Sequence, residues 1–337
     1  MVNVAVVGCG YWGPNLIRNF YALPGCRVGK ICDSNRERLE YVGRLYPGSE
    51  LTEEFAAVVE DPGIDAIAIV TPVHTHFALA RETLRVGKHT FIEKPMAASV
   101  AECRELLEIV EERSLTLMVG HTFVYHPTVR KIKEIIASGE IGDLMYISSR
   151  RLNLGLFQND INVAWDLAPH DISIILFIVD HDPVSVNCQG KAHIRRDIED
   201  VTNMTINFAN GGIALIQSSW IDPRKIRETT IVGSKKMIVY DDNEPLEKIK
   251  IYDKRVEVPP HYDTYAEFHF SYHYGDIHVP YLKQIEPLKV ECQQFLNCIE
   301  SGEKSDSSGQ EGLKVVQVLE AATQSLKNGG SEVAITI

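Results

Sequence analysis

Short apolar runs alternate with amphipathic segments along the first third of the chain. The run at 64–72 (IDAIAIVTP) is continuous rather than alternating, as is typical of a parallel strand covered on both faces. We expect further strands at 2–8, 27–33, 89–95 and 115–121, separated by helices at 14–23, 34–46, 75–87 and 99–114. This rhythm predicts an α/β fold with a doubly wound parallel sheet and right-handed crossovers.

The pattern changes after about residue 123. Helices are expected at 128–138 and 166–179, and strands at 144–155, 184–194, 200–209, 212–220, 227–241 and 248–258. Turn residues such as Asn210, Gly211 and Gly212 join successive strands, which predicts an open, mainly antiparallel sheet. The segment 285–328 is helical again. We therefore expect two domains, a parallel α/β domain at 1–122 and an α+β domain at 123–337.

Composition narrows the classes of function. The 337 residues carry a net charge of −12 without a basic cluster, which disfavours nucleic acid and anionic membranes as partners. The longest apolar run, 172–179, is shorter than the roughly 18 residues of a membrane span. Seven scattered cysteines without a CxxC pair argue against zinc and favour reduced thiols. With no signal-peptide layout, we expect a cytoplasmic protein without a bound metal.

A glycine-rich loop follows the first predicted strand. Gly8, Gly10 and Gly13 have the spacing G-x-G-x-x-G, and Asp33 ends the second strand 20 residues later. This context predicts a dinucleotide loop that places a pyrophosphate at a helix N-terminus. The charge of Asp33 opposes a 2′-phosphate and favours NAD, while Ser34 and Arg36 leave NADP open. A Rossmann-like turn without a cofactor is the alternative.

Two further motifs follow later strands, where open α/β sheets bind ligands. The first is TPVHTH, which begins at Thr71 and Pro72 and ends at His76. The second is EKP, residues 93–95, in which Lys94 can bind an alkoxide. Taken alone, this position favours an ordinary surface lysine over a functional one.

The stretch WDLAPHD, residues 165–171, places two polar side chains four residues apart. Asp166 and His170 would then share one face of a helix, with Pro169 in its first turn. The alternatives are an N-cap role for Asp166 and a structural role for His170.

Together, these motifs resemble the Gfo/Idh/MocA oxidoreductase family over essentially the whole chain. GHTFVYHP (120–127) and the ending SGQEGLKVVQVLEAATQSLKNG (308–329) are also similar to it. The resemblance implies that one face of the second-domain sheet covers the active site, while the other often forms a subunit interface. It also implies catalytic roles for Lys94, Asp166 and His170. The residues expected at the cofactor are Gly8, Gly10, Tyr11, Trp12, Gly13, Asp33, Ser34, Thr71, Pro72, His76, Glu93 and Lys94.

The chemistry of these three residues suits the oxidation of a secondary alcohol. An imidazole such as that of His170, with an ordinary pKa of about 6.5, can take the hydroxyl proton. Lys94 can stabilise the developing alkoxide as a fixed positive charge. Asp166 can orient the imidazole or bind a substrate hydroxyl.

The expected substrate comes from the same resemblance. The WDLAPHD variant lacks the glycines that precede this motif in many relatives and is similar to relatives in sugar-nucleotide metabolism. We expect oxidation at C3 of a UDP-linked N-acetylglucosamine or its uronic acid, with cations and amides holding the diphosphate and sugar. The residues considered are Tyr125, His126, Arg150, Arg151, Asn153, Gln158, Asn162, Asp166 and His170, with only one of the two arginines facing the site.

Three other functions stay open. They are an inositol or free-sugar dehydrogenase, an NADPH-dependent ketosugar reductase, and a non-catalytic dinucleotide sensor. Intact Lys94, Asp166 and His170 count against the sensor. A homodimer or homotetramer is expected, because the second-domain sheet has too few helices to cover both faces.

Overall fold

The computed structural model describes residues 1–179, 181–257 and 270–335. The chain forms two compact units. Unit 1 comprises Met1–His126 and Ile285–Glu320, and unit 2 comprises the described residues of Pro127–Gln284 and Ala321–Thr336. The division falls within one helix, α9 (Gly309–Lys327).

Unit 1 contains the parallel sheet that the apolar rhythm predicts. Its strand order is β3-β2-β1-β4-β5-β6. The chain adds β2 and β3 on one side of β1 and then β4, β5 and β6 on the other, as in doubly wound folds. The strands are β1 (Val2–Val7), β2 (Cys26–Cys32), β3 (Glu50–Thr52), β4 (Ala66–Ile69), β5 (His89–Glu93) and β6 (Leu117–Gly120). The helices before α9 are α1 (Gly13–Tyr21), α2 (Arg36–Leu45), α3 (Ala56–Val59), α4 (Val73–Arg85), α5 (Val100–Arg113), the short 3₁₀ helix η1 (Thr122–Tyr125) and α8 (Pro287–Ser301).

Helix α8 belongs to unit 1, although the sequence analysis assigned its residues to the second domain. Phe295 of α8 contacts Phe20 of α1 and Phe91 of β5 edge to face, with ring centroids 6.2 and 5.7 Å apart. Because these buried rings lie in one core, α8 packs with the parallel sheet. Unit 1 therefore includes the later segment Ile285–Glu320, whereas the sequence analysis divided the chain once, between residues 122 and 123.

Unit 2 is built on a nine-stranded sheet with the order β14-β13-β12-β11-β7-β10-β9-β8-β15. β7 pairs with β10 in parallel and with β11 antiparallel, which makes the sheet mixed but mainly antiparallel, as expected. The strands are β7 (Leu144–Leu154), β8 (Pro183–Lys191), β9 (Val201–Phe208), β10 (Ile213–Ser219), β11 (Ile221–Gly233), β12 (Met237–Asp241), β13 (Ile249–Glu257), β14 (Ser271–His278) and β15 (Val333–Ala334). Its helices are α6 (Pro127–Ala137) and α7 (Val163–Ile178).

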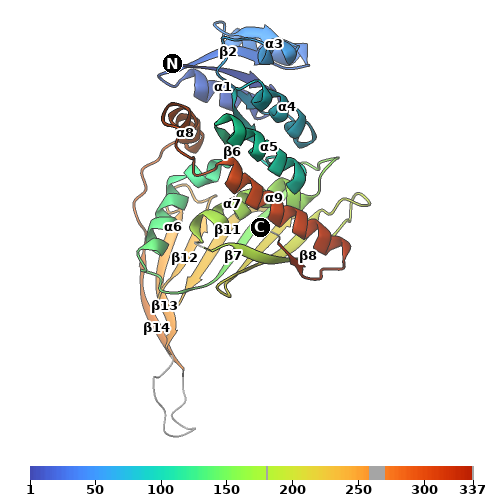
Figure 1. Cartoon of the computed structure of the whole chain (residues 1–337). Coiled ribbons are helices and arrows are strands. Elements are labelled where there is room, and N and C mark those ends of the chain that lie inside the picture. The colour runs from blue at the N-terminus through green and yellow to red at the C-terminus, as the bar shows by residue number, and fades with distance from the viewer. Residues whose placement is uncertain (180, 258–269, 336–337) are drawn as a thin grey trace. The chain divides into compact units, whose positions relative to one another are not determined.

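Helix α7 lies across one face of this sheet (Figure 1) and contacts β7, β9 and β10. The strand β10 shows the alternation that results: Ala214 and Ile216 are buried, while Ile213 and Leu215 are exposed on the opposite side. The register places the exposed pair beside Asn207 and Thr205 of β9. At these positions the outer face therefore mixes apolar and polar side chains.

A buried ion pair joins α7 to the sheet. Arg151 of β7 donates to both carboxylate oxygens of Asp171 on α7, at 2.6 and 3.2 Å, and the two side chains are only 6% and 3% exposed. Ser149 donates a further hydrogen bond to Asp171 at 2.8 Å. Burial lowers the pKa of the Arg151 guanidinium, but the charge of Asp171 outweighs this, so the net shift is upward. This pair fixes the rotation of α7 about its axis.

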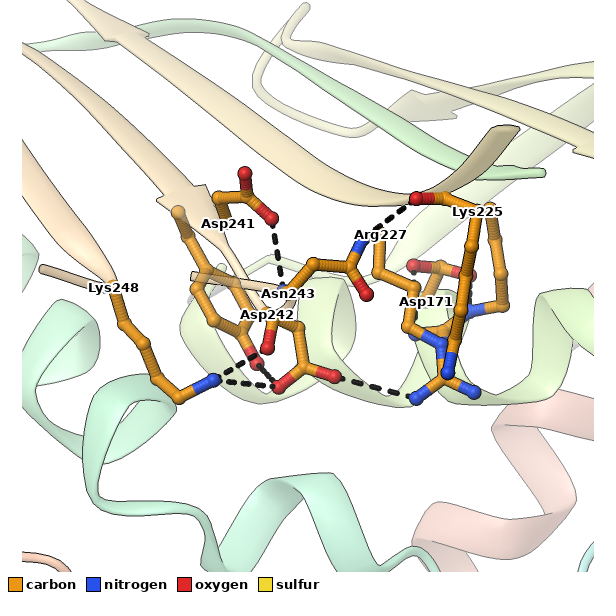
Figure 2. A network of polar contacts seen from close by, with 9 residues as sticks. Asp171, Lys225, Arg227, Asp241, Asp242, Asn243 and Lys248 are labelled. Atoms are coloured by element: carbon orange, nitrogen blue, oxygen red, sulfur yellow. Dashed lines mark hydrogen bonds and ion pairs between the residues drawn. The ribbon is translucent and has the colours of Figure 1, made fainter. Parts of the chain in front are cut away.

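A second polar cluster, centred on Asp242, lies beside this ion pair (Figure 2). Asp242 accepts hydrogen bonds from Tyr240, Arg227 and Lys248, and Asp171 lies beyond Arg227. Burial raises the pKa of the Tyr240 hydroxyl well above its usual value, with the Asp242 charge adding to this effect. Tyr240 therefore stays neutral and donates a hydrogen bond to the Asp242 carboxylate.

Within residues 1–179, 181–257 and 270–335, no helix combines the length and apolar character needed to cross a membrane. In the same described part of the chain, histidine, cysteine and carboxylate side chains form no cluster suited to a metal ion.

Candidate active site

The glycine loop between β1 and α1 has the geometry of a dinucleotide cradle. Gly8 has φ +105°, and a Cβ there would lie 2.4 Å from the Val70 carbonyl oxygen. A Cβ on Gly13 would lie 2.1 Å from the carbonyl oxygen of Gly8. At Gly10 a Cβ would meet nothing within 4 Å, so the backbone there faces open space. Two glycines are thus required by the turn, and the middle one leaves room for a pyrophosphate.

The N-terminus of α1 completes this cradle. Its N-cap residue, Trp12, makes no side-chain capping bond. Pro14 has no N–H and the Asn15 N–H donates to the Trp12 carbonyl at 3.0 Å, so the Gly13 N–H is the donor that this first turn offers to an anion. Tyr11 is 91% exposed beside it. These features fit the phosphates of NAD.

Asp33 lies directly after β2 and contacts the same loop. Its Oδ2 accepts a hydrogen bond from the Cys9 N–H, and its Oδ1 accepts one from Asn35 at 2.8 Å. The carboxylate therefore holds the loop in place, and the residue is half-buried, followed by the exposed Ser34. We retain its proposed contact with the adenosine ribose.

Replacing Asp33 by Asn should weaken the preference for NAD over NADP. The amide oxygen can still accept from Cys9, but the negative charge that opposes a 2′-phosphate is lost. The measurement is kcat/KM for both cofactors, with Glu37→Ala on the exposed start of α2 as a control for charge alone. An NADP preference in the unaltered protein, or the same discrimination in Asp33→Asn, would contradict this role.

The TPVHTH motif links two loops of the cofactor site. The buried ring of His76 lies between the carbonyl oxygens of Thr71, at 2.8 Å from Nε2, and Pro95, at 2.9 Å from Nδ1. Burial lowers the pKa of His76, so the ring is neutral and donates one of these contacts. His76 therefore braces the loops after β4 and β5, which gives it a supporting position rather than the expected direct contact with the cofactor.

The EKP motif begins at the end of β5 and contains a cis peptide bond between Lys94 and Pro95. Lys94 is half-buried, and its backbone N–H lies 3.2 Å from Oε2 of Glu93. Glu93 pairs with Gly120 of the neighbouring strand β6. A Cβ at Gly120 would lie 2.9 Å from Oε1 of Glu93, so this glycine makes room for the carboxyl group.

Two buried titratable side chains outside the EKP motif, Glu291 and His121, interact electrostatically with its residues. Glu291 of α8 accepts a hydrogen bond from the Thr122 hydroxyl at 2.7 Å. Burial raises the pKa of Glu93 to about 7 and that of Glu291 well above its usual value, with Glu93 adding to the latter shift. Burial also lowers the pKa of His121 to about 3, helped by the charge of Lys94. His121 is therefore neutral at neutral pH, and folding favours the protonated form of Glu291.

The free energy of unfolding should decrease less between pH 5.5 and pH 8 in Glu291→Gln than in the unaltered protein. A raised pKa in the folded state means that folding binds a proton above the ordinary carboxyl pKa, so stability falls as pH rises through this window. The amide keeps a neutral side chain without this cost. Urea midpoints at both pH values measure the effect.

The neighbouring Glu286 supplies a matched control for this experiment. Arg18 lowers its pKa through a hydrogen bond, so Glu286→Gln should affect stability equally at pH 5.5 and 8. An equal pH dependence in Glu291→Gln and the unaltered protein would contradict the assignment of the buried carboxyl.

In unit 2, α7 carries the D-x-x-x-H motif. Asn162 is the N-cap and accepts a hydrogen bond from the Trp165 N–H at 3.2 Å, so Asp166 is not the cap. The helix starts at Val163, so Pro169 lies inside it. The expected position of Pro169, in the first turn, is therefore wrong. Asp166 and His170 lie one turn apart on this helix, both half-buried. The carboxylate of Asp166 accepts a hydrogen bond from the indole of Trp220 at 3.0 Å.

Several residues expected at the substrate are occupied by other contacts. Arg151 is paired with Asp171, and Arg150 pairs with Glu228 at 2.6 Å on the other side of β7. Asn162 caps α7 and donates to Glu199 at 2.8 Å. The buried hydroxyl of Tyr125 bonds to Ser307 at 2.8 Å. These contacts give the four side chains structural positions.

Asn153 is differently placed. It lies two residues after Arg151 on β7, so it shares the side of the strand that faces α7. It is half-buried, as is Gln158 in the loop that follows. The sequence analysis did not single out Trp220, His121 or Glu291. Only tertiary contacts identify their roles, because Trp220 and Glu291 lie in ordinary strand and helix stretches and His121 is one of several polar residues in GHTFVYHP.

Fold and site define an NAD-binding Rossmann oxidoreductase with a second, mainly antiparallel unit. The family model for the NAD-binding Rossmann fold of the oxidoreductase family matches residues 2–121, and that for the GFO/IDH/MocA C-terminal domain matches residues 129–239. The chain belongs to the Gfo/Idh/MocA oxidoreductase family. This confirms the resemblance, the fold class and NAD as the cofactor.

Similar proteins differ in their named substrates. The UDP-N-acetylglucosamine 3-dehydrogenase of Acidithiobacillus ferrooxidans is 29% identical over 233 residues, covering 67% of this chain and 68% of the relative. The scyllo-inositol 2-dehydrogenase (NAD(+)) of Bacillus subtilis is 25% identical over 343 residues, covering 97% and 95%. The solved structure of the former, GnnA, shares the fold with a TM-score of 0.79, 24% identity and coverage of 97% and 98%.

Proposed function

We propose that this protein oxidises the C3 hydroxyl of a UDP-linked amino sugar or its uronic acid to a ketone, using NAD. The observation that carries the proposal is the 29% identity to a UDP-N-acetylglucosamine 3-dehydrogenase, together with the D-x-x-x-H motif on α7. Bound NAD supplies the hydride acceptor.

The residues of this chain have separate roles in that reaction. The His170 imidazole takes the hydroxyl proton as the C–H bond breaks. The Lys94 ammonium stabilises the negative charge that develops on the oxygen. Asp166, one helical turn before His170, orients the imidazole. The glycine loop and Asp33 hold the dinucleotide.

A free polyol is the second candidate substrate, and the ion pairs of two arginines favour it. The sequence argument for a diphosphate relied on Arg150 or Arg151, yet both guanidinium groups are paired with carboxylates. The scyllo-inositol dehydrogenase also matches over nearly the full length of this chain. NADPH-dependent reduction of a ketosugar and dinucleotide sensing without catalysis have no comparable observation.

The deciding experiment is a substrate panel. NADH formation is followed with UDP-N-acetylglucosamine, its uronic acid, myo-inositol, scyllo-inositol and glucose, and the keto product is located by NMR. Turnover of a UDP-sugar at C3 supports the proposal. Turnover of the free polyols alone transfers the function to the second candidate.

We also propose that the outer face of the unit 2 sheet forms a homodimer or homotetramer interface. Ile213 and Leu215 are exposed there on a strand whose other face packs on α7. Sedimentation at micromolar concentration should show the oligomer, and Leu215→Asp should dissociate it. A monomeric unaltered protein would refute this proposal.

A further inference from the structure

Trp220, a buried aromatic residue of unit 2, makes a polar contact with a proposed site residue. Trp220 follows β10 directly and is only 1% exposed. An indole has one N–H and no acceptor. In Trp220 that N–H donates to Oδ2 of Asp166 at 3.0 Å.

Several contacts fix the position of this indole. The backbone of Trp220 is held on both sides: its backbone N–H donates to the carbonyl oxygen of Asp200 at 3.0 Å, and its carbonyl oxygen accepts from the backbone N–H of Gly155 at 2.9 Å. The ring of Phe157 lies 5.3 Å away, centroid to centroid. A Cβ on Gly155 would lie 2.9 Å from Cδ1 of the indole, so this glycine allows the loop after β7 to approach the ring. These contacts restrict the position of the indole donor.

We propose that Trp220 is a positioning residue, which holds the Asp166 carboxylate in the orientation that the oxidation requires. Asp166 lies on α7, whereas Trp220 lies at the end of a sheet strand, so this bond ties the motif helix to the sheet at the level of the reacting side chains. Hydrogen bonds to a charged acceptor are stronger than neutral ones and restrict its rotamer. The inference rests on the proposed role of Asp166.

The chain offers a matched control. Trp165 lies next to Asp166 on α7, and its indole donates to the Thr323 hydroxyl at 2.8 Å, also within unit 2. Trp220→Phe and Trp165→Phe thus each remove one indole donor and retain an aromatic ring. Only the first removes a bond to Asp166.

The test is a double-mutant cycle on kcat/KM with the substrate found by the panel. Trp220→Phe should lower kcat/KM about 10-fold, the scale of a charged hydrogen bond, chiefly through kcat. In the Asp166→Asn background the same substitution should change it less than twofold, because the charged acceptor is already lost. Trp165→Phe should leave kcat/KM within about twofold of the unaltered protein.

The outcomes separate the two proposals. Near-normal turnover in Asp166→Asn would overturn the proposed role of Asp166. Impaired Asp166→Asn with unchanged Trp220→Phe, or an equal loss from Trp220→Phe in both backgrounds, would overturn the inference about Trp220.

A spectroscopic measurement tests the contact if Trp220→Phe does not fold. The chain has three tryptophans, so the Trp220 indole resonance in a ¹⁵N–¹H spectrum is the one that remains in both Trp12→Phe and Trp165→Phe. Asp166→Asn should shift this resonance more than that of Trp165. An unshifted Trp220 signal would overturn the inference.

Discussion

Replacing His170 or Lys94 by alanine is expected to lower turnover about 100-fold or more, the usual scale for losing a general acid–base or charge-stabilising group. NAD affinity should change little, because Gly8–Gly13 and Asp33 supply most of the proposed contacts with the dinucleotide. Single-turnover hydride transfer and NAD titration measure the two quantities separately.

The control for this prediction is a histidine far from the proposed chemistry in the chain. His278 is exposed at the end of the edge strand β14, so His278→Ala should retain normal turnover. Near-normal rates in both His170→Ala and Lys94→Ala would place the chemistry elsewhere. A loss of NAD binding equal to the loss of rate would instead assign these residues to the cofactor.

Replacing Arg151 by Met is expected to destabilise the fold by about 3–5 kcal/mol. The substitution leaves the buried carboxylate of Asp171 without its guanidinium partner, and an unpaired buried charge is costly. The free energy of unfolding can be measured by urea denaturation followed by circular dichroism, with attention to separate transitions of the two units.

Adjacent Arg150 provides the comparison. Its pair with Glu228 is exposed at 44% and 30%, so Arg150→Met should cost about 0–1 kcal/mol. The double variant Arg151→Met, Asp171→Leu should recover most of the loss, because it removes both buried charges. Equal stability of Arg150→Met and Arg151→Met would show that the buried pair contributes no more than the exposed one.

These two arginines also show why the substrate site was harder to predict than the cofactor site. The sequence analysis argued that Arg150 and Arg151 point to opposite sides of a strand, which is correct because side chains alternate along a strand. It could not identify their partners. Asp171 and Glu228 lie 20 and 78 residues away and reach them only through the packing of α7 and the pairing of β11.

The parallel sheet, the glycine loop and the helix that carries Asp166 and His170 could be predicted from the sequence, because they depend on local periodicity and on backbone conformations that few residues adopt. The edge strand β3 was not predicted, because its three residues carry no apolar pattern. The packing of α8 in unit 1 depends on tertiary contacts, those of Phe295 with Phe20 and Phe91. The tertiary structure likewise decides that Trp220 donates to Asp166 and that Glu291 interacts electrostatically with Glu93 of the EKP motif. Burial and hydrogen-bond partners are properties of segments distant in the chain, and no local pattern encodes which of them meet.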